Sequence, residues 1–400
     1  MNKIFEGIKV LDCGSFIAIP AATTILSDFG ADVIKIEPPG AGDPYRQVPR
    51  LPGSPESDYN YGWMVDNRNK KGLALDIATP EGREVLLRLV SQSDVFATNF
   101  PDQVRNRLGI TYEQLGELNE RLIYASFSGY GERGSEANKP GFDVTAWWAR
   151  SGMMDMVRPD AAAEPARPTL GMGDHSSAMT LFAGIVTALY RRELTGRGGQ
   201  VSSSLLANGL WSNAYYTQAA LCGARFIDRP PREQALNALT SYYRCADGRW
   251  LILTIVNEER HWPSLAAALG RPELVKDPRF ITRSQRHTHS VELIEILDEV
   301  FATHDREHWR GRLNANGIIF DVVATAEDLP RDQQLLDNDM LVPFAGESML
   351  TIDSPITVAG TDKVQPRQAP GVGQHSEEVL LSAGYDTSRI KELQARGIVA

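Results

Sequence analysis

The strongest constraint on the fold is a regular alternation of strand-like and helix-like segments in the N-terminal third of the chain. The segments IKVLD (8–12) and ADVIKIEPPG (31–40) have the apolar content of buried strands, and PAATTILSDFG (20–30) between them carries apolar residues at helical spacing. The scheme recurs in residues 79–100 and 111–131. Strands that alternate with helices in this way predict an α/β fold, with a parallel sheet covered by helices on both faces.

The pattern changes near residue 220. One strand-like segment, GRWLILTIV (248–256), is followed by several helix-like ones, and this mixture predicts a smaller α+β domain over residues 225–325. We therefore expect a large domain over residues 1–224 and a C-terminal segment, residues 326–400, that returns to the large domain.

The composition limits the partners of the protein. The chain of 400 residues has 51 acidic and 41 basic side chains, and its formal charge of −10 argues against a general affinity for nucleic acid. The longest apolar run, residues 178–190, is too short to span a bilayer, so no membrane partner is expected. The cysteines, Cys13, Cys222 and Cys245, are scattered and form no C-x-x-C pair, which predicts a cytoplasmic protein without a structural zinc site.

A glycine-rich stretch, SGYGERG (128–134), matches the pattern G-x-G-x-x-G after a predicted strand. A dinucleotide-binding loop of this type needs a helix directly afterwards, but SEANKPG (135–141) indicates a loop. We therefore expect the stretch to line an active-site cleft rather than to bind a dinucleotide. His304 and His308 share a helical face but lack the H-E-x-x-H pattern, so no metal ligands are predicted.

The segment GMGDHSSAMTLFAG (171–184) places Asp174 after two glycines and before an apolar, helix-like run. One interpretation is a helix N-cap, in which the carboxylate accepts hydrogen bonds from the amides of Ser176 or Ser177. The other is a covalent nucleophile, because a helix start keeps a carboxylate ionised and the glycines leave its approach open. The segment alone permits both roles.

Several segments, spread in order over nearly the whole chain, form one recognisable set. They are GIKVLDCGSFIAIPAATTILSDFGADVIKIEPPGAGDPYR (7–46), NRNKKGLALDIATPEG (67–82), TNFPDQVRNRLGI (98–110), LIYASFSGYGERG (122–134), GMGDHSSAMTLFAGIVTALYRRELTGRGGQV (171–201), DPRF (277–280) and APGVGQHSEEVL (369–380). As a set they resemble the class III CoA-transferases, the group that includes formyl-CoA transferase and the carnitine and bile-acid CoA-transferases.

The resemblance implies a fold and a reaction. The fold is a Rossmann-like large domain plus a small domain, in a homodimer whose two subunits are interlocked like rings. By position Asp174 is the nucleophile, which attacks an acyl-CoA thioester to form a mixed anhydride and then an enzyme–CoA thioester. Gly131 and the neighbouring loop amides are expected to stabilise the oxyanion of each tetrahedral intermediate.

The resemblance also implies a CoA site, in which CoA is bound as part of the substrate and no metal or redox cofactor is needed. The positions that match CoA-contacting residues of the family are Phe16, Ala18, Leu75, Asn99, Phe100 and Arg107. Lys139 lies close to a lysine with the same purpose. The chain departs from the family at Pro38 and Ala78, which replace basic residues, and at TIVNEERHW (254–262), which replaces a glycine loop that shields the thioester.

Two further departures concern the acid substrate. Ile17 and Phe142 stand at positions that are polar or hydrogen-bonding in formyl-CoA transferase. A second carboxylate buried there would be costly without a partner, so we expect an apolar monocarboxylic acid as substrate. The tryptophans of GFDVTAWW (141–148) either line the same apolar pocket or belong to the core. Arg46 or Arg150 could still supply the missing charge.

Two alternatives to an acyl-CoA:carboxylate CoA-transferase remain at this point. A 2-methylacyl-CoA racemase of the same family uses a histidine in a GHD motif, but Phe142 occupies that position here and cannot take a proton. His175, beside Asp174, could in principle substitute for it. The other alternative is a non-catalytic CoA-binding protein, against which the retained G-D motif and Asn99 argue.

Overall fold

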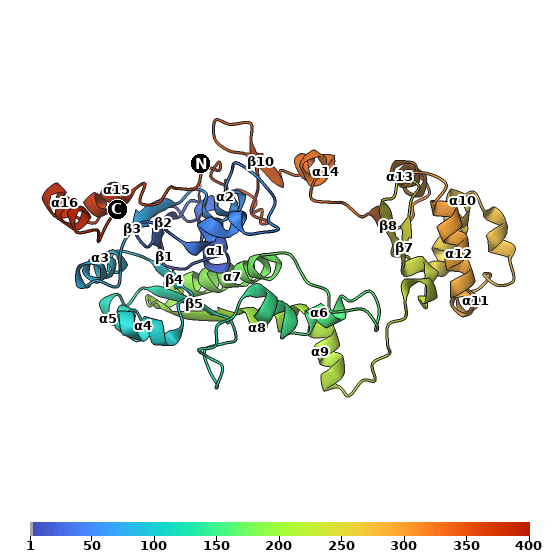
Figure 1. The fold of residues 1–400 in the computed structure, drawn as a ribbon, viewed down its shortest axis with the longest axis horizontal. Coiled ribbons are helices and arrows are strands. Elements are labelled where there is room, and N and C mark those ends of the chain that lie inside the picture. Colours follow the sequence, from blue (N-terminus) through green and yellow to red (C-terminus); the bar gives the residue numbers. More distant parts are fainter. Residues whose placement is uncertain (1–2) are drawn as a thin grey trace. The chain divides into compact units, whose positions relative to one another are not determined.

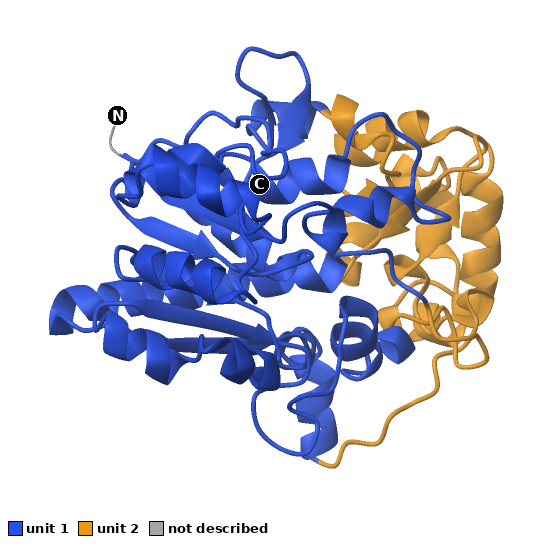
Figure 2. Ribbon diagram, turned by 60° about the vertical axis from the view of Figure 1, so that its left-hand side comes forward, with its two compact units in different colours: residues 1–156, 167–222, 333–400 blue, residues 157–166, 223–332 orange. Residues whose placement is uncertain are grey.

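A computed structural model of the protein describes residues 3–400. The chain divides into two compact units (Figure 2). Unit 1 comprises Met1–Met156, Arg167–Cys222 and Gln333–Ala400, and unit 2 comprises Val157–Ala166 and Gly223–Asp332.

Residues 157–166 differ from the sequence-based division, which placed them in the large domain. They group with unit 2. The reason is local pairing: the amide of Ala161 donates a hydrogen bond to the carbonyl of Arg229 (3.0 Å), and a guanidinium nitrogen of Arg229 donates to the carbonyl of Arg158 (2.5 Å).

The centre of unit 1 is a six-stranded sheet in the order β3-β2-β1-β4-β5-β6, and all of its neighbouring strands are parallel (Figure 1). Its strands are β1 (Lys9–Asp12), β2 (Asp32–Glu37), β3 (Lys71–Ala74), β4 (Val95–Thr98), β5 (Ile123–Ser128) and β6 (Gly199–Ser204). The predicted parallel α/β sheet is therefore confirmed. The order reverses between β1 and β4, and ligands of such sheets bind outside the carboxyl ends of the strands at this point.

Helices cover both faces of this sheet (Figure 1). One apolar core lies between the sheet and helices α1 (Ala18–Asp28) and α7 (Met172–Thr195). The second core lies against α3 (Pro80–Val90), α15 (Ser376–Ser382) and α16 (Thr387–Ala395). Successive strand residues alternate between the two cores, because the side chains of a strand point to opposite faces.

The C-terminal segment belongs to unit 1 from Gln333 onward. It is anchored beside β3, where Leu75 forms a bridge with Val399 and His375 Nδ1 accepts a hydrogen bond from the amide of Gly72 (3.1 Å). The other elements of unit 1 are η1 (Pro44–Arg50), α2 (Tyr61–Asn67), α4 (Asp102–Leu108), α5 (Tyr112–Leu118), η2 (Asp143–Ala149), α6 (Met153–Met156), α8 (Leu205–Ser212), α9 (Ala214–Leu221), α14 (Gln333–Asp337), β10 (Leu341–Pro343) and β11 (Leu350–Ile352).

Unit 2 is a small α+β body with its own core. Its antiparallel sheet is formed by β7 (Tyr242–Arg244), β8 (Trp250–Leu253) and β9 (Phe320–Val322). Its helices are α10 (Glu258–Ala268), α11 (Arg283–Thr288), α12 (Ser290–Phe301) and α13 (Arg306–Ala315), with short 3₁₀ turns η3 (Arg232–Gln234), η4 (Ala238–Thr240), η5 (Pro272–Lys276) and η6 (Leu329–Arg331). Buried aromatic and aliphatic side chains fill the space between them.

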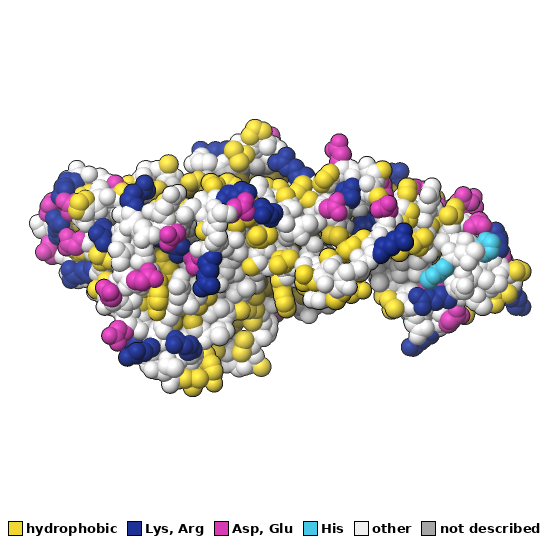
Figure 3. Space-filling view, turned by 90° about the horizontal axis from the view of Figure 1, so that it is seen from below, with side chains coloured by type: hydrophobic (Ala, Val, Ile, Leu, Met, Phe, Trp, Pro, Cys, Tyr) yellow, Lys and Arg dark blue, Asp and Glu magenta, His cyan; other side chains and the backbone are white. Residues whose placement is uncertain are grey.

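The distribution of surface charge and the length and polarity of the helices agree with what the sequence predicts. Basic and acidic side chains are interspersed on the face drawn in Figure 3. Within residues 3–400, each helix is too short or too polar to cross a bilayer.

Candidate active site

Asp174 lies in the first turn of α7, but it does not cap this helix. The N-cap is Gly171, whose left-handed conformation (φ 84°) starts the helix at Met172, earlier than the capping interpretation requires. The amide of Gly173 donates instead to Asp143 Oδ2 (3.1 Å), so a carboxylate from η2 takes the capping role. The interpretation that Asp174 binds the amides of Ser176 or Ser177 is therefore wrong.

The glycines before Asp174 allow the start of α7 to pack closely against η2. A Cβ atom on Gly173 would collide with Asp143 Oδ1 and lie 2.5 Å from Trp147 Cγ. Trp147 and Trp148 are buried in the core, each about 6% exposed, with ring centroids 4.9 Å apart. Of the two roles open to these tryptophans, the structure supports the core.

The Asp174 carboxylate is half-buried and is left out of the helix hydrogen bonding. Among residues 3–400, the charged groups that act on this carboxylate are Asp143, His175 and Asp66, and no hydrogen-bond donor contacts it. Burial raises the pKa of Asp174 to about 7, and the nearby Asp143 adds to this rise. The expectation that the helix start holds this carboxylate ionised is therefore corrected, because burial and a neighbouring carboxylate outweigh the helix dipole.

His175 is held between two acceptors. Its Nε2 lies 2.9 Å from Asp66 Oδ1, and its Nδ1 lies 2.9 Å from the Gly171 carbonyl oxygen. The other oxygen of Asp66 accepts the hydroxyl of Tyr45 (2.8 Å). Burial lowers the pKa of His175, but the hydrogen bond and charge of Asp66 outweigh it and raise the pKa to about 9. A histidine whose two nitrogens both donate has no lone pair with which to act as a base.

The sequence did not identify Asp66 and Tyr45 as site residues. Asp66 lies 109 residues before His175 and ends up beside it only because α2 packs against α1, which in turn packs against α7. The segment around it, YNYGWMVDN (59–67), carries no motif that marks an acidic site residue.

An apolar wall lies near the start of α7. The rings of Phe16 and Phe142 meet edge to face, with centroids 5.4 Å apart. Phe16 has a positive φ of 61°, which is rare for a residue with a side chain, and its amide donates to Asp43 Oδ1 (3.2 Å). Ile17 is buried, 2% exposed, and a Cβ on Gly171 would lie 3.2 Å from its Cδ1. Phe142 is exposed and adjoins Asp143, the residue that caps α7.

Most of the expected CoA-contacting residues follow the carboxyl ends of strands. Asn99, after β4, binds the backbone of Ser15 in both directions, accepting from its amide (3.0 Å) and donating to its carbonyl (2.9 Å). These two hydrogen bonds fix the loop that carries Phe16, and this loop leads to Ala18 at the start of α1. Phe100, the next residue after Asn99, is half-buried.

Leu75 follows the carboxyl end of another strand, and the two cations of the expected CoA set lie on a helix and in a loop. Leu75 is buried directly after β3. Arg107 is exposed on α4. Lys139 lies 2.8 Å from Glu136 and 4.8 Å above the ring of Tyr130, so its charge already has partners.

The Gly131 amide is engaged within its own loop. It donates to Ser128 Oγ (3.0 Å), and the positive φ of Gly131, 100°, allows this turn. The Gly131 amide can donate to an oxyanion only after it gives up its hydrogen bond to Ser128 Oγ.

Arg46 and Arg150, the two arginines considered as partners of a second substrate carboxylate, are both paired with acidic side chains. Arg46 forms two hydrogen bonds with Glu37 (2.8 and 2.7 Å) and stacks on Trp63, 3.7 Å from the ring centroid. Arg150 lies 3.0 Å from Glu136. Neither guanidinium is left over as the missing positive charge.

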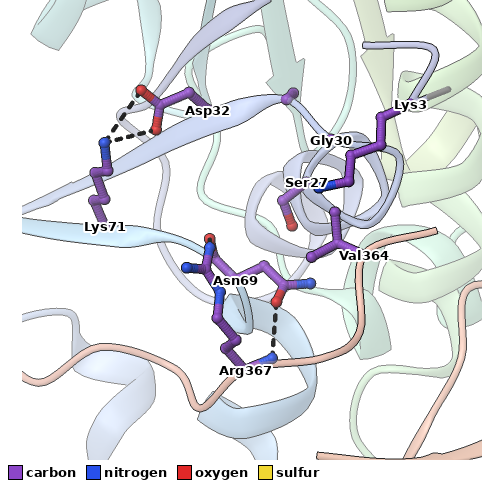
Figure 4. A pocket seen from close by; sticks show the side chains of 9 residues that line it. Lys3, Ser27, Gly30, Asp32, Asn69, Lys71, Val364 and Arg367 are labelled. Atoms are coloured by element: carbon purple, nitrogen blue, oxygen red, sulfur yellow. Dashed lines mark hydrogen bonds and ion pairs between the residues drawn. The ribbon is translucent and has the colours of Figure 1, made fainter. Parts of the chain in front are cut away.

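A hollow of about 480 Å³ in unit 1 lies at the opposite edge of the sheet (Figure 4). Asp32 and Lys71, which line it, begin β2 and β3, whereas most of the expected CoA-contacting residues follow the carboxyl ends of strands. In Figure 4, Lys71 points to Asp32, and Asn69 to Arg367. This hollow is therefore not the candidate active site.

Within residues 3–400, no group of three or more His, Cys, Asp or Glu side chains is arranged to hold a metal ion. His304 and His308 stack on each other in unit 2, with ring centroids 3.9 Å apart.

Comparison with known proteins identifies the family. Residues 5–376 match the model of CoA-transferase family III. The chain is 32% identical to (R)-2-hydroxy-4-methylpentanoate CoA-transferase of Clostridioides difficile, over 99% of each chain, and 30% identical to cinnamoyl-CoA:phenyllactate CoA-transferase of Clostridium sporogenes, over 98% of this chain and 96% of the relative. The crystal structure of a CAIB/BAIF family protein from Brucella suis is similar with a TM-score of 0.86 and 26% identity, over 96% of this chain and all of that one. As the resemblance predicted, the chain belongs to CoA-transferase family III and is a CoA-transferase.

Proposed function

We propose that the protein transfers CoA from an acyl-CoA to a free carboxylic acid, with Asp174 as the covalent nucleophile. The observation that carries this proposal is the Asp174 carboxylate itself, which is half-buried, free of hydrogen-bond donors and has a pKa raised to about 7. A half-buried carboxylate to which the protein donates no hydrogen bond is more nucleophilic than a fully solvated aspartate once it is ionised.

The reaction needs two anhydrides and one thioester on Asp174. An oxygen of the carboxylate attacks the thioester carbon of the donor, the C–S bond breaks, and CoA leaves as a thiolate. The thiolate attacks the side-chain carbonyl carbon of Asp174, which releases the donor acid as a carboxylate and leaves an Asp174–CoA thioester. The acceptor carboxylate displaces the thiolate in turn, and attack of the thiolate on the acceptor carbonyl restores Asp174. No electron or proton is exchanged with a cofactor, and CoA takes part only as substrate.

The CoA site in this proposal is the set matched by the family resemblance. It consists of Phe16, Ala18, Leu75, Asn99, Phe100, Arg107 and Lys139, with Gly131 and its loop as donors to the oxyanion. The bond from Asn99 to the loop before α1 supports this placement, because it holds that loop at the switch point of the sheet.

The acid substrate in this proposal is an apolar monocarboxylate. The wall of Phe16, Ile17 and Phe142 supports it, as does the engagement of Arg46 and Arg150 by acidic partners. Two relatives are named for acids with a branched or an aromatic body, 4-methylpentanoate with a 2-hydroxyl group and phenyllactate.

The racemase alternative predicts a different result in deuterium oxide. Phe142 has no atom that accepts a proton, and both nitrogens of His175 face acceptors. We therefore expect no exchange of the α-proton of a 2-methylacyl-CoA, measured by mass spectrometry after incubation with the enzyme in deuterium oxide. Rapid uptake of deuterium that depends on Asp174 would overturn the transferase assignment. The non-catalytic alternative is not favoured, since relatives named for CoA transfer match the whole length of the chain.

A homodimer is part of the proposal. Helices α8 and α9 carry large exposed apolar side chains, with Trp211 80%, Tyr215 83% and Leu221 77% exposed. Burial of such a patch against a second copy would stabilise the assembly by roughly 25 cal/mol for each Å². The mass in solution, measured by light scattering, should be twice the chain mass of 44.1 kDa. A single chain mass at micromolar concentration would contradict the dimer.

A further inference from the structure

Tyr45, Asp66 and His175 form a hydrogen-bonded chain that ends beside Asp174. The Tyr45 hydroxyl donates to one oxygen of Asp66 (2.8 Å), and the other oxygen lies 2.9 Å from His175 Nε2. The second ring nitrogen of His175 lies 2.9 Å from the carbonyl oxygen of Gly171. A carboxylate and a carbonyl can only accept, so both ring nitrogens carry hydrogen and the ring is an imidazolium.

The first two members of the chain are held rigidly. Asp66 is 1% and Tyr45 is 4% exposed. The backbone carbonyl of Asp66 accepts from Lys70 Nζ (2.9 Å), which is paired in turn with Asp12 (2.8 Å). The amide of Tyr45 donates to Asp43 Oδ1 (2.9 Å). The buried charges of Lys70, Asp12 and Asp43 therefore hold Asp66 and Tyr45 in place, and with them the anion that faces the His175 ring.

The charges around His175 are otherwise negative or neutral. Asp66 faces it from α2, Tyr45 approaches through Asp66 from η1, Asp143 lies on η2, and Asp174 is its neighbour on α7. Of the charged groups within residues 3–400 that act on Asp174, Asp143 and Asp66 disfavour its ionisation and His175 favours it. During turnover the negative charge leaves Asp174 and returns, passing to the CoA thiolate and to the free acids in between. A fixed cation at this place favours every one of these anions.

Resting on the proposed transferase function, we propose that Tyr45 and Asp66 are positioning residues that hold His175 as an imidazolium beside Asp174. The charge of this ring favours the ionised nucleophile, against burial and the acidic neighbours, and stabilises the thiolate and carboxylates that form in each transfer. The raised pKa of His175, about 9, and the pKa of Asp174, about 7, agree with this role, because both groups are charged between these two values.

The first test is the pH dependence of kcat/KM with an acyl-CoA and an acceptor acid. In the wild type, kcat/KM should rise through pH 7 as Asp174 ionises and fall through pH 9 as His175 loses its proton. Asp66→Asn should move the upper limb toward the ordinary histidine value of 6.5. At pH 8 this shift from about 9 lowers the imidazolium fraction, and with it kcat/KM, by about 30-fold. Tyr45→Phe should move the same limb by a smaller amount.

His175→Gln provides the complementary variant. Loss of the favourable charge of His175 next to Asp174 should abolish the upper limb of the profile and move the lower limb to higher pH. His308→Gln, at an exposed histidine of unit 2, is the matched control and should keep the wild-type profile. Unchanged limbs in both Asp66→Asn and His175→Gln would overturn the proposal.

The second test does not depend on activity. In protein labelled with ¹⁵N at histidine, the ring nitrogens of His175 should titrate near pH 9 in the wild type and near 6.5 in Asp66→Asn, with His175→Gln used for assignment. If Asp174→Asn keeps turnover, the proposed function itself is wrong. If instead the Asp174–CoA adduct forms and the His175 titration is unshifted in Asp66→Asn, only the positioning role is wrong. A shifted titration with an unshifted kcat/KM profile also overturns that role, because the charge then takes no part in transfer.

Discussion

Replacement of Asp174 by asparagine is expected to lower kcat for CoA transfer by about 10⁴-fold or more, the usual scale for loss of a covalent nucleophile. An amide oxygen cannot form the anhydride, and no second carboxylate can take its place, because Asp143 caps α7 and Asp66 is bound by Tyr45 and His175. The rate should be measured with purified protein and an acyl-CoA donor over a range of acceptor acids. Asp362→Asn, at an exposed aspartate, is the control and should keep full activity.

The same variant should be more stable than the wild type at pH 8. The pKa of Asp174 rises from 3.8 to about 7 on folding, so the folded protein is penalised once this group ionises. The penalty is absent below pH 4, grows between pH 4 and 7, and is complete above pH 7, where it amounts to as much as about 4 kcal/mol. Thermal unfolding of Asp174→Asn and wild type at pH 8 and pH 4 should show this difference at pH 8 only. Activity lost together with stability at pH 8 would instead indicate a structural role for Asp174.

A monocarboxylate with an apolar body is expected to exceed a dicarboxylate of similar length by about 100-fold in kcat/KM as acceptor. A second carboxylate that binding encloses between Ile17 and Phe142 would lose its water without gaining a charged partner, and this costs several kcal/mol. The comparison needs one donor and matched acceptors, such as 4-methylpentanoate and glutarate.

The matched variant for this comparison is Ile17→Gln. This substitution places a hydrogen-bonding side chain in the apolar wall. It should lower the ratio of kcat/KM for the monocarboxylate to kcat/KM for the dicarboxylate by at least about tenfold, mainly by raising kcat/KM for the dicarboxylate. A wild-type preference of tenfold for the dicarboxylate would disprove the apolar pocket.

The architecture of unit 1 could be predicted because each of its elements is encoded locally. Three predicted segments correspond to β1, α1 and β2: the strand over 8–12, the helix over 20–30 and the strand over 31–40. They could be predicted because apolar periodicity and the proline and glycine residues that end an element act over a few residues. Motifs in order along the chain then pointed to the family, which the comparison confirmed.

The details of the site depend on contacts between distant residues, and these could not be predicted. A rule for helix caps considers the residues next to the helix start, but the residue that binds the Gly173 amide is Asp143, which lies 30 positions away. The same holds for His175, whose neighbour Asp174 is visible in the sequence but whose partner Asp66 is not. The raised pKa of Asp174 likewise follows from burial and from the nearby Asp143 on η2, which no local pattern reveals.

The most direct test of the account is the mass of the enzyme after incubation with an acyl-CoA donor and no acceptor. If Asp174 carries CoA as a thioester, intact-protein mass spectrometry should show an added mass equal to CoA less one water. Peptide mapping should place this mass on the segment that contains Asp174, and borohydride should convert the adduct to an alcohol. The adduct should be absent from Asp174→Asn and should disappear from the wild type when an acceptor acid is added. Full turnover by the wild type without any adduct at Asp174, or an adduct at another residue, would contradict the account.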